Sequence, residues 1–410
     1  MNKVQCDIVI SGAGPAGATL ALMLAGSGLK IILLDKDLFP RGKVCGDALS
    51  GQVVSILKRM PGNLYREFHA TVPKTPSYGI RFVSPDLHSI GIPFPGGTDG
   101  EPAGYICQRK EFDSFLISAV RKQQDILFLE GEQVENIELK PEGVLVTTSR
   151  SVISGRMVAG ADGVHSVVRD LLAGGHPEKS RLSTGIRAYF NGVTGFQPGG
   201  YIELWFLREL LPFYFWIFPG TGGLCNAGLA LPRGVITKKK IILAKELERI
   251  VRTHPAIAPR FAAAEMAGKP EAHSLPLAMP AGPFSGSRFI LLGDAASLVD
   301  PFTGEGIGNA MASAEVAARV IRVCAERGDF SGQVLKEYDR QILRRMDSGL
   351  RTSRWLHRLA RYPLLLDRVI GRAERNRTIR EIISVAFYDE KLRKKLAWRL
   401  LMGKQTPESD

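Results

Sequence analysis

The 410-residue sequence lacks a hydrophobic run that approaches the roughly 20 apolar residues needed to span a bilayer. Its start does not follow the pattern of a secretory signal, because only Lys3 precedes the first apolar residues and Asp7 soon interrupts them. The five cysteines are widely spaced and form no CxxC pair, which argues against a disulfide framework or a zinc site. The seven histidines form no HxxxH or HxH group, so no metal site is expected. A cytoplasmic location is the expectation.

Charge is unevenly distributed along the chain. The formal net charge is +13, and residues 336–399 contain 18 Lys and Arg against 8 Asp and Glu. Segments 351–359 and 391–399 alternate cationic and apolar residues and each contains a Trp, a pattern typical of helices that lie in a membrane interface. Helices packed on the rest of the protein with a solvated basic face fit the pattern equally well. Peripheral membrane contact is therefore one expectation, whereas no motif supports nucleic-acid binding.

A glycine-rich turn follows the first apolar run. Residues 4–10 and 30–35 predict buried parallel strands, and residues 15–26 predict the helix between them. In the turn Gly12-Ala13-Gly14-Pro15-Ala16-Gly17, the glycines allow the tight turn, close approach of a pyrophosphate and close packing of the helix. The phosphates would meet a helix N-terminus, which favours anions. Asp35 ends the second strand, where a carboxylate accepts hydrogen bonds from a ribose, so the unit predicts a dinucleotide site.

A second glycine-rich turn lies far along the chain. Gly293-Asp294-Ala295-Ala296 follows a predicted strand at 288–292, and residues 300–310 lead into a predicted helix at 306–327. With this motif the chain resembles the FAD-dependent oxidoreductases of the para-hydroxybenzoate hydroxylase superfamily. The resemblance implies that Asp294, Gly306 and Ile307 contact the flavin. A helix N-terminus there would stabilise the negative charge of a reduced flavin.

Two further segments occur in the order that this family shows. Residues 160–163, Gly-Ala-Asp-Gly, resemble its DG motif, and Arg109 precedes a predicted helix at 111–122 as does a family arginine that reaches FAD. The resemblance implies FAD as cofactor, with NAD(P)H or another electron donor. The implied cofactor-binding residues are Gly12, Gly14, Ala16, Gly17, Asp35, Cys45, Gly46, Ala48, Arg109, Val134, Asp162, Asp294, Gly306 and Ile307.

A cysteine-containing segment narrows the resemblance. Residues 43–48, Lys-Val-Cys-Gly-Asp-Ala, resemble the Cys-Gly segment that passes over the flavin in geranylgeranyl reductases. Asp47 and Ala48 depart from the Gly or Glu that often follows in that family. A small cysteine can simply line the ring, whereas a reactive one needs a setting that stabilises its thiolate. Both interpretations of Cys45 stay open.

An aromatic segment supports the same branch. Residues 214–219 resemble the YxWxFP signature of geranylgeranyl reductases, although Leu211 stands where that family usually has Pro. Period-two alternation on a strand places Tyr214, Trp216 and Phe218 on one face. They would then wall an apolar substrate pocket suited to a polyprenyl chain. An ordinary aromatic sheet core gives the same pattern, and flavin-dependent halogenases carry a related stretch.

The predicted fold is α/β, with a Rossmann-like FAD-binding domain of the glutathione reductase type, an inserted antiparallel-sheet substrate domain and a helical C-terminal tail. The predicted FAD-binding domain comprises residues 1–75, 105–180 and 280–330. The substrate domain comprises residues 76–104 and 181–279, and residues 331–410 form a basic helical region. A single helix is expected at 239–252, and one covered face is expected for the antiparallel sheet.

Three kinds of function fit these motifs. The favoured one is a reductase that passes a hydride from reduced FAD to a carbon–carbon double bond of an apolar, isoprenoid-like substrate. The alternatives are a group A flavin monooxygenase or a halogenase-like enzyme, although no candidate for the halogenases' catalytic lysine stands out, and a flavoprotein that carries electrons without substrate chemistry of its own. No catalytic residue is assigned, and Tyr214, Cys45 and bound water are all open as proton donor.

Overall fold

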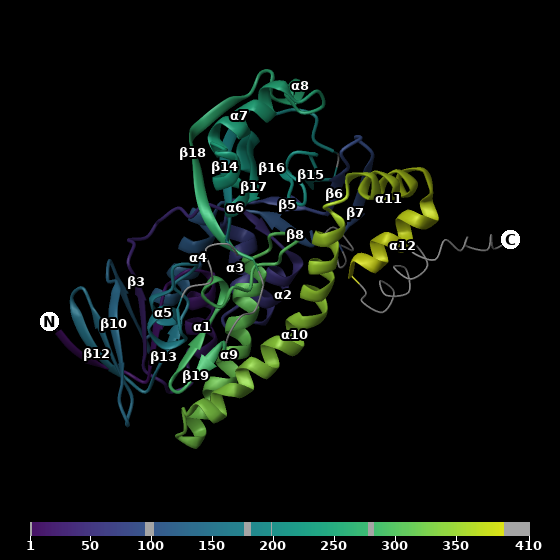
Figure 1. Ribbon diagram of the computed structural model, residues 1–410. Helices are drawn as coiled ribbons and strands as arrows, with labels where there is room; N and C mark the ends of the chain where they lie inside the picture. Colours follow the sequence, from purple (N-terminus) through teal and green to yellow (C-terminus); the bar gives the residue numbers. More distant parts are fainter. Residues whose placement is uncertain (1, 95–101, 176–181, 198, 278–282, 389–410) are drawn as a thin grey trace.

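A mainly parallel six-stranded sheet, with strands from both ends of the chain, forms the lower part of the molecule in the view of Figure 1. The computed structural model describes residues 2–94, 102–175, 182–197, 199–277 and 283–388. The strand order is β19 (Ser285–Gly286), β20 (Phe289–Leu291), β13 (Met157–Gly160), β2 (Ile8–Ser11), β3 (Ile31–Asp35) and β9 (Ile126–Glu130). Strands β2, β3 and β13 are wholly buried, which explains their continuous apolar sequences.

Helices pack on this sheet and form a hydrophobic core together with it. Helix α1 (Pro15–Leu24) packs against α4 (Arg109–Arg121) and α9 (Ile307–Arg327), and α5 (Val167–Leu172) packs on β13. A second sheet of four strands lies beside them, in the order β1 (Asn2–Gln5), β12 (Ser151–Gly155), β11 (Val144–Thr148) and β10 (Val134–Leu139). The predicted βαβ unit is present, and β12 is a strand that the sequence analysis missed.

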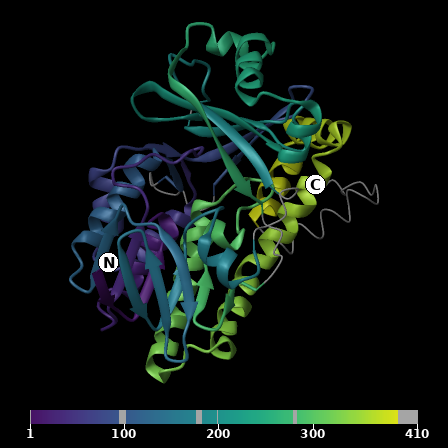
Figure 2. The same cartoon turned by 60° about the vertical axis from the view of Figure 1, so that its left-hand side comes forward.

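The aromatic segment belongs to a seven-stranded sheet, seen above the first sheet in Figure 2. Its order is β18 (Glu265–Pro276), β14 (Leu182–Asn191), β17 (Leu224–Pro232), β16 (Phe215–Pro219), β15 (Tyr201–Trp205), β6 (Gly79–Val83) and β7 (Ser89–Pro93). All neighbouring strands are antiparallel except β15 and β6, which are parallel. Both faces of this sheet carry hydrophobic clusters, so the expectation of one covered face was wrong.

The helix expected at 239–252 is present, but it begins later, at Leu243. The structure has α6 (Arg233–Lys239) and α7 (Leu243–Thr253), and Lys240 between them adopts a left-handed φ of 52° that no α-helix contains. Helix α7 and α8 (Ala258–Phe261) cover one face of the seven-stranded sheet. A small sheet of β4 (Ala48–Leu49), β8 (Gly104–Ile106) and β5 (Thr75–Ser77), with α2 (Gly51–Arg59) and α3 (Leu64–Thr71), lies between the two large sheets.

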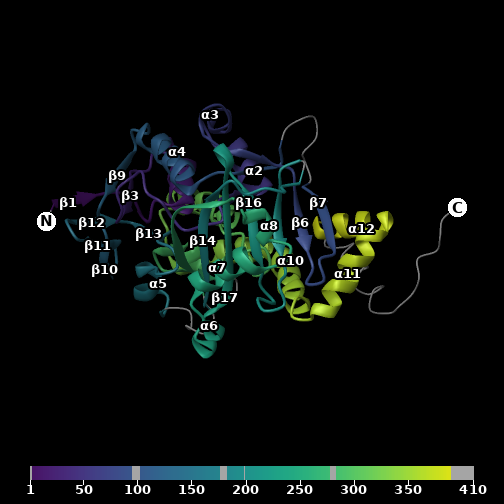
Figure 3. The same ribbon diagram turned by 90° about the horizontal axis from the view of Figure 1, so that it is seen from above.

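The C-terminal helices are part of the packed structure. The first half of α10 (Gly332–Leu359) buries Leu335, Tyr338 and Ile342 in the core of the six-stranded sheet. Its end and α11 (Pro363–Arg375) contribute Ala360 and Ile370 to the cluster on the seven-stranded sheet. Figures 1 and 3 show α10 running from beside the six-stranded sheet to the seven-stranded sheet. Helices α11 and α12 (Arg377–Tyr388) lie at the far end from β1.

Polar contacts fix α11 to the β6–β7 hairpin. Glu374 contacts His88 Nδ1 at 2.8 Å, and Asp367 accepts the backbone N–H of Asp86 at 2.9 Å. This region is therefore a folded element and not a free tail as far as residue 388. The predicted amphipathic segment 391–399 lies outside the described residues. Among the described residues, no helix is both long and apolar enough to cross a membrane.

Burial of α10 predicts a large stability effect at Tyr338, whose side chain is fully buried and whose hydroxyl donates to Leu291 O at 2.8 Å. We expect Tyr338→Ala to lower the free energy of unfolding by about 3–5 kcal/mol and Tyr338→Phe by about 1 kcal/mol. Leu343→Ala, on an exposed position of the same helix, should change it by less than about 0.5 kcal/mol. Urea titration of the three variants measures this, and equal losses in all three would contradict the packing described.

Candidate flavin site

The N-terminal glycine loop is shaped by close backbone contacts. Gly12 has a φ of 97°, and a Cβ there would overlap Ala161 O, whereas a Cβ on Gly17 would overlap Gly12 O. Gly14 differs, because a Cβ there would meet only the Arg41 guanidinium, at 3.7 Å. Gly14 also caps α1, and no side chain fills that cap in the structure described. The first N–H groups of α1 therefore face a space that an anion can enter.

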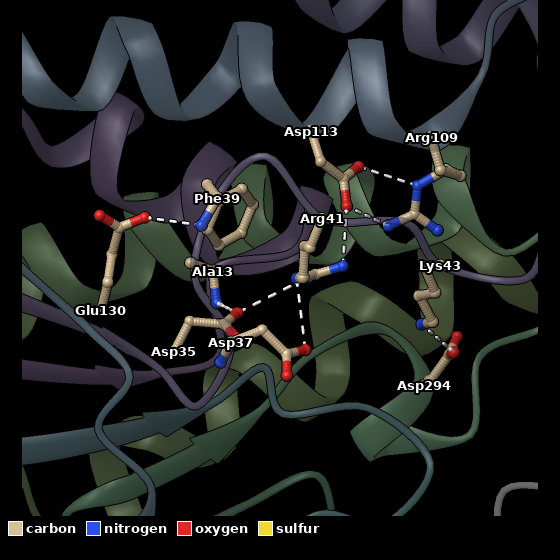
Figure 4. Close-up of polar contacts among 10 residues, drawn as sticks. All are labelled: Ala13, Asp35, Asp37, Phe39, Arg41, Lys43, Arg109, Asp113, Glu130 and Asp294. Atoms are coloured by element: carbon tan, nitrogen blue, oxygen red, sulfur yellow. Dashed lines mark hydrogen bonds and ion pairs between the residues drawn. The ribbon is translucent and has the colours of Figure 1, made fainter.

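A chain of ion pairs runs beside this loop (Figure 4). Asp35 accepts the backbone N–H of Ala13 at 2.8 Å, which ties the end of β3 to the loop. Arg41 lies between Asp35 and Asp113, at 3.5 Å and 3.2 Å. Arg109, which is almost fully buried, forms two hydrogen bonds with Asp113, at 2.8 Å and 2.6 Å. The predicted Arg109 is thus held rigidly in one orientation.

A cavity of about 710 Å³ continues from the glycine loop into the space between the two large sheets. Most of the predicted site residues line it: Gly14, Ala16, Cys45, Gly46, Ala48, Arg109, Tyr214, Trp216, Phe218, Asp294, Gly306 and Ile307. Its size falls in the usual range of small-molecule sites. Segments from both ends of the chain therefore meet around one space.

The remaining predicted residues lie away from the cavity wall. Gly12, Gly17 and Asp35 shape the loop behind it. Asp162 accepts the N–H groups of Val167 and Val168, at 2.9 Å and 3.3 Å, and so caps α5. Val134 is buried at the start of β10. The structure does not bring Asp162 and Val134 into the cavity that the other residues share.

Lys43 and Asp294, which both line the cavity, form an ion pair with 3.2 Å between Nζ and Oδ2 (Figure 4). Burial alone would raise the pKa of Asp294, but the Lys43 ammonium group, together with the other basic groups nearby, holds that pKa below its usual value. Asp294 is therefore ionised at neutral pH and can accept hydrogen bonds from hydroxyl groups. Gly306 and Ile307 beside it form the N-terminus of α9.

The Cys45 segment packs on the aromatic strand. A Cβ on Gly46 would lie 3.0 Å from the Phe218 ring, so a larger residue would push this ring aside. Behind the segment, Asp47 is fully buried and accepts hydrogen bonds from Tyr189, Asn226 and the Arg109 backbone, at 2.6, 2.8 and 3.2 Å. Burial raises the pKa of the Cys45 thiol. A protonated thiol supports the interpretation of Cys45 as a residue that lines the cavity.

The aromatic strand separates its side chains as period-two alternation requires. Trp216 and Phe218 face the cavity, whereas Phe215 and Ile217 pack into the opposite cluster with α7. Tyr214 precedes the strand and donates its hydroxyl to Thr303 O at 2.5 Å. Phe302 and other apolar side chains complete this part of the wall. The wall is therefore apolar over the area that faces the glycine loops.

Several functional candidates escaped the sequence analysis. Arg41 precedes the Cys45 segment and Lys43 begins it. Their positive charges next to a predicted flavin contact were the sequence signal that could have identified them. His273 on β18 also lines the cavity, and its Nε2 is buried without a hydrogen-bond partner among the described residues. Burial and the nearby Lys43 lower the pKa of His273 to about 4, so the imidazole is neutral at pH 7. Glu305, between two glycines of the second turn, is a further cavity residue.

These residues fit FAD. The uncapped helix start at Gly14 suits a pyrophosphate, Asp35 fixes the loop from behind through Ala13, and Asp294 suits a ribityl hydroxyl. The open space at Gly14 is the observation that carries this fit, because the neighbouring glycines have no such space.

Comparison with known proteins agrees with this fit. Residues 5–194 match the family described as FAD binding domain. A digeranylgeranylglycerophospholipid reductase from Thermoplasma acidophilum is 26% identical over 357 residues, which cover 83% of this chain and 84% of the relative. The crystal structure of a geranylgeranyl bacteriochlorophyll reductase-like protein from Thermoplasma acidophilum has a TM-score of 0.78, with 21% identity and coverage of 97% and 99% of the two chains. A flavin-dependent brominase has a TM-score of 0.77, with 19% identity and coverage of 98% and 100%.

The matched domain and the sequence relatives indicate an FAD-dependent oxidoreductase. Over most of its length the chain is similar in sequence to digeranylgeranylglycerophospholipid reductases, and it shares the fold of a geranylgeranyl bacteriochlorophyll reductase-like protein.

Two of the three glycines of the first turn, Gly14 and Gly17, give a matched pair for testing the site. Gly14→Ala should leave the stability of the apoprotein within about 0.5 kcal/mol, because space is open there, and should weaken FAD binding at least about tenfold by blocking the phosphate approach. Gly17→Ala should destabilise the fold by about 3 kcal/mol or more, because its Cβ overlaps backbone. Thermal unfolding and flavin fluorescence titration separate the two effects. Unchanged FAD affinity in Gly14→Ala would place the cofactor elsewhere.

Proposed function

We propose that this protein reduces a carbon–carbon double bond in an apolar, isoprenoid-like substrate bound between the FAD and the aromatic wall. FAD, when bound, supplies the two-electron chemistry. The observation that carries the proposal is the continuity of one cavity from the glycine loops to Trp216 and Phe218. The similarity to a digeranylgeranylglycerophospholipid reductase and to a geranylgeranyl bacteriochlorophyll reductase-like protein supports the same substrate class.

The proposed roles of the residues follow from their positions. The α1 N-terminus and Asp35 would hold the ADP half of FAD, whereas Asp294 and the α9 N-terminus would hold the flavin half. The Cys45 segment, fixed by Asn226 and Asp47, would lie over the ring. Tyr214, Trp216 and Phe218 would hold the alkene by apolar contact and exclude water. Because hydride transfer to an unactivated alkene is slow, such positioning supplies much of the rate enhancement.

A reduction test distinguishes this proposal from oxygen chemistry. We expect the anaerobically reduced holoenzyme to be reoxidised by polyprenyl compounds, and each turnover should add two hydrogen atoms to the product. Flat aromatic compounds without an isoprenoid chain are the control and should not reoxidise it. Stopped-flow absorbance and mass spectrometry measure both. Reoxidation that needs O₂ and yields a hydroxylated or halogenated product would instead support the monooxygenase or halogenase alternative. NAD(P)H is the proposed electron donor, and the same assay tests it against other reductants.

We further propose peripheral contact with an anionic membrane at the corner between α10 and α11. Exposed apolar side chains gather there: Trp355, Tyr362, Leu364 and Leu365 are 39%, 62%, 66% and 37% exposed. The exposed arginines Arg358, Arg361 and Arg368 lie among them in the chain. Apolar groups flanked by arginines complement the interface of an anionic bilayer.

The same corner is linked to the cavity. His357 of α10 makes an edge-to-face ring contact with Phe213, at 5.1 Å between ring centroids, and Phe213 lines the cavity wall. An enzyme that takes an apolar substrate from a bilayer needs its docking surface near its binding site. The position of this corner supports the proposal.

Vesicle sedimentation tests the docking surface. At low salt we expect vesicles with anionic lipid to bind the protein, and neutral vesicles to bind it at least about tenfold more weakly, since each basic residue near the surface contributes about 1 kcal/mol. The double variant Trp355→Ser, Leu364→Ser should lose most of this binding. Leu171→Ser, an exposed leucine on α5 that is 45% exposed, is the matched control and should bind normally. Equal recovery with anionic and neutral vesicles would remove the proposal.

A further inference from the structure

Glu305 lies in the cavity wall and takes no part in the cofactor contacts proposed above. It stands between Gly304 and Gly306, immediately before α9, and its Oε1 is hydrogen-bonded to Ser50 Oγ. Gly308 in the first turn of α9 makes room for it, because a Cβ there would overlap Glu305 Oε1. The carboxyl group is therefore packed between the beginnings of α2 and α9.

Three segments of the site converge at this carboxyl group. Ser50 follows the Cys45 segment by a few residues. Tyr214, from the aromatic wall, donates its hydroxyl to Thr303 O, two residues before Glu305. Gly306 and Ile307, the proposed flavin contacts at the α9 N-terminus, follow Glu305 directly. A proton on Glu305 is thus held where the cofactor-binding and substrate-binding parts of the cavity meet.

Four other groups in the cavity wall are poor candidates for the proton donor. Burial raises the pKa of both Tyr214 and Cys45, which makes them weaker acids. The Lys43 ammonium group is paired with the ionised Asp294. His273 is neutral at pH 7, because its pKa is lowered to about 4. Tyr214, Cys45 and His273 therefore do not match the acidity that proton donation at neutral pH requires.

Glu305 has the required acidity. Burial is the main cause that raises its pKa to about 7. The negative charge of Asp300 also raises this pKa, whereas the hydrogen bond from Ser50 lowers it. A carboxyl group of this kind is protonated below pH 7 and ionised above. It can give up its proton during a reaction and recover one from water afterwards.

We propose that Glu305 is the acid that protonates the substrate during double-bond reduction. The inference rests on the reductase function proposed above. The alkene π bond breaks, a hydride carrying two electrons from reduced FAD forms a C–H bond at one carbon, and the Glu305 O–H bond breaks as its proton forms a C–H bond at the other carbon. The products are the saturated chain, oxidised FAD and the Glu305 carboxylate. Water reprotonates the carboxylate, and NAD(P)H or another two-electron donor reduces FAD again.

The wild-type protein alone gives the first test. The rate at which a polyprenyl substrate reoxidises the reduced holoenzyme should be constant below pH 7 and fall about tenfold per pH unit above it, because only the protonated carboxyl group donates. The rate of FAD reduction by dithionite should not follow this profile. A reoxidation rate that is flat from pH 5 to pH 9 would overturn the role of Glu305.

Matched variants give the second test. Glu305→Gln keeps the size of the side chain and can still contact Ser50, but has no acidic proton. We expect it to retain FAD and to slow reoxidation by about 100-fold or more, with the pH-dependent limb lost. Glu305→Asp should restore part of the rate. Glu326→Gln, the same change at an exposed position of α9, is the control and should behave as wild type. Wild-type reoxidation in Glu305→Gln would overturn the proposal.

An infrared titration reads the same proton without turnover. The oxidised holoenzyme should show the carbonyl band of a protonated carboxylic acid at pH 6, which disappears as the pH rises through about 7 and is missing in Glu305→Gln. Persistence of this titrating band in Glu305→Gln would contradict the assignment.

The experiments distinguish failure of the reductase proposal from failure of the Glu305 proposal. Wild-type protein that no alkene reoxidises would end the reductase function, whereas wild-type reoxidation matched by Glu305→Gln would end only the role of Glu305. If Glu305→Gln loses FAD, the wild-type pH profile and band decide.

Discussion

The Asp47 carboxyl group joins the two halves of the molecule. Burial raises its pKa, and such a group is stable inside a protein only when hydrogen-bond donors surround it. Its donors come from both sides: Tyr189 and Asn226 from the seven-stranded sheet, and the Arg109 backbone from α4 beside the six-stranded sheet. Asn226 also donates to Cys45 O and accepts the Trp216 indole N–H, at 2.8 Å and 2.9 Å. One buried network therefore sets the distance between the Cys45 segment and the aromatic wall.

The elements that could be predicted from the sequence are those with a local physical signature. The loop from Gly12 to Gly17 is defined by steric contacts within a few residues, and the alternation at Trp216 and Phe218 is a property of one strand. The convergence of Asp294, Cys45 and Arg109 on one cavity was inferred from a family resemblance. Their roles toward FAD, like the predicted domain bounds, remain predictions.

What could not be predicted depends on partners distant in the chain. Strand β6 pairs with β15, which begins more than a hundred residues later, and no local pattern announces a parallel pair within an antiparallel sheet. Glu305 was visible within its glycine turn, but its acidity depends on burial beside Ser50, 255 residues earlier. The amphipathic pattern of α10 suits a membrane surface and a protein core equally, and only packing shows that Tyr338 faces a core while Trp355 is exposed.

The path of α10 has a mechanical consequence. Its 28 residues are anchored at one end in the core of the six-stranded sheet, and at the other in the cluster that contains Trp216 and Phe218. A continuous helix of this length resists bending, so a hinge motion that widened the cavity would have to pull Ala360 or Tyr338 out of its packing. The width of the cavity is therefore nearly fixed. Under the proposed function, a cavity of fixed width would select among flexible substrates by how far each chain can enter and which double bond then lies at the reactive position, and less by closing around them.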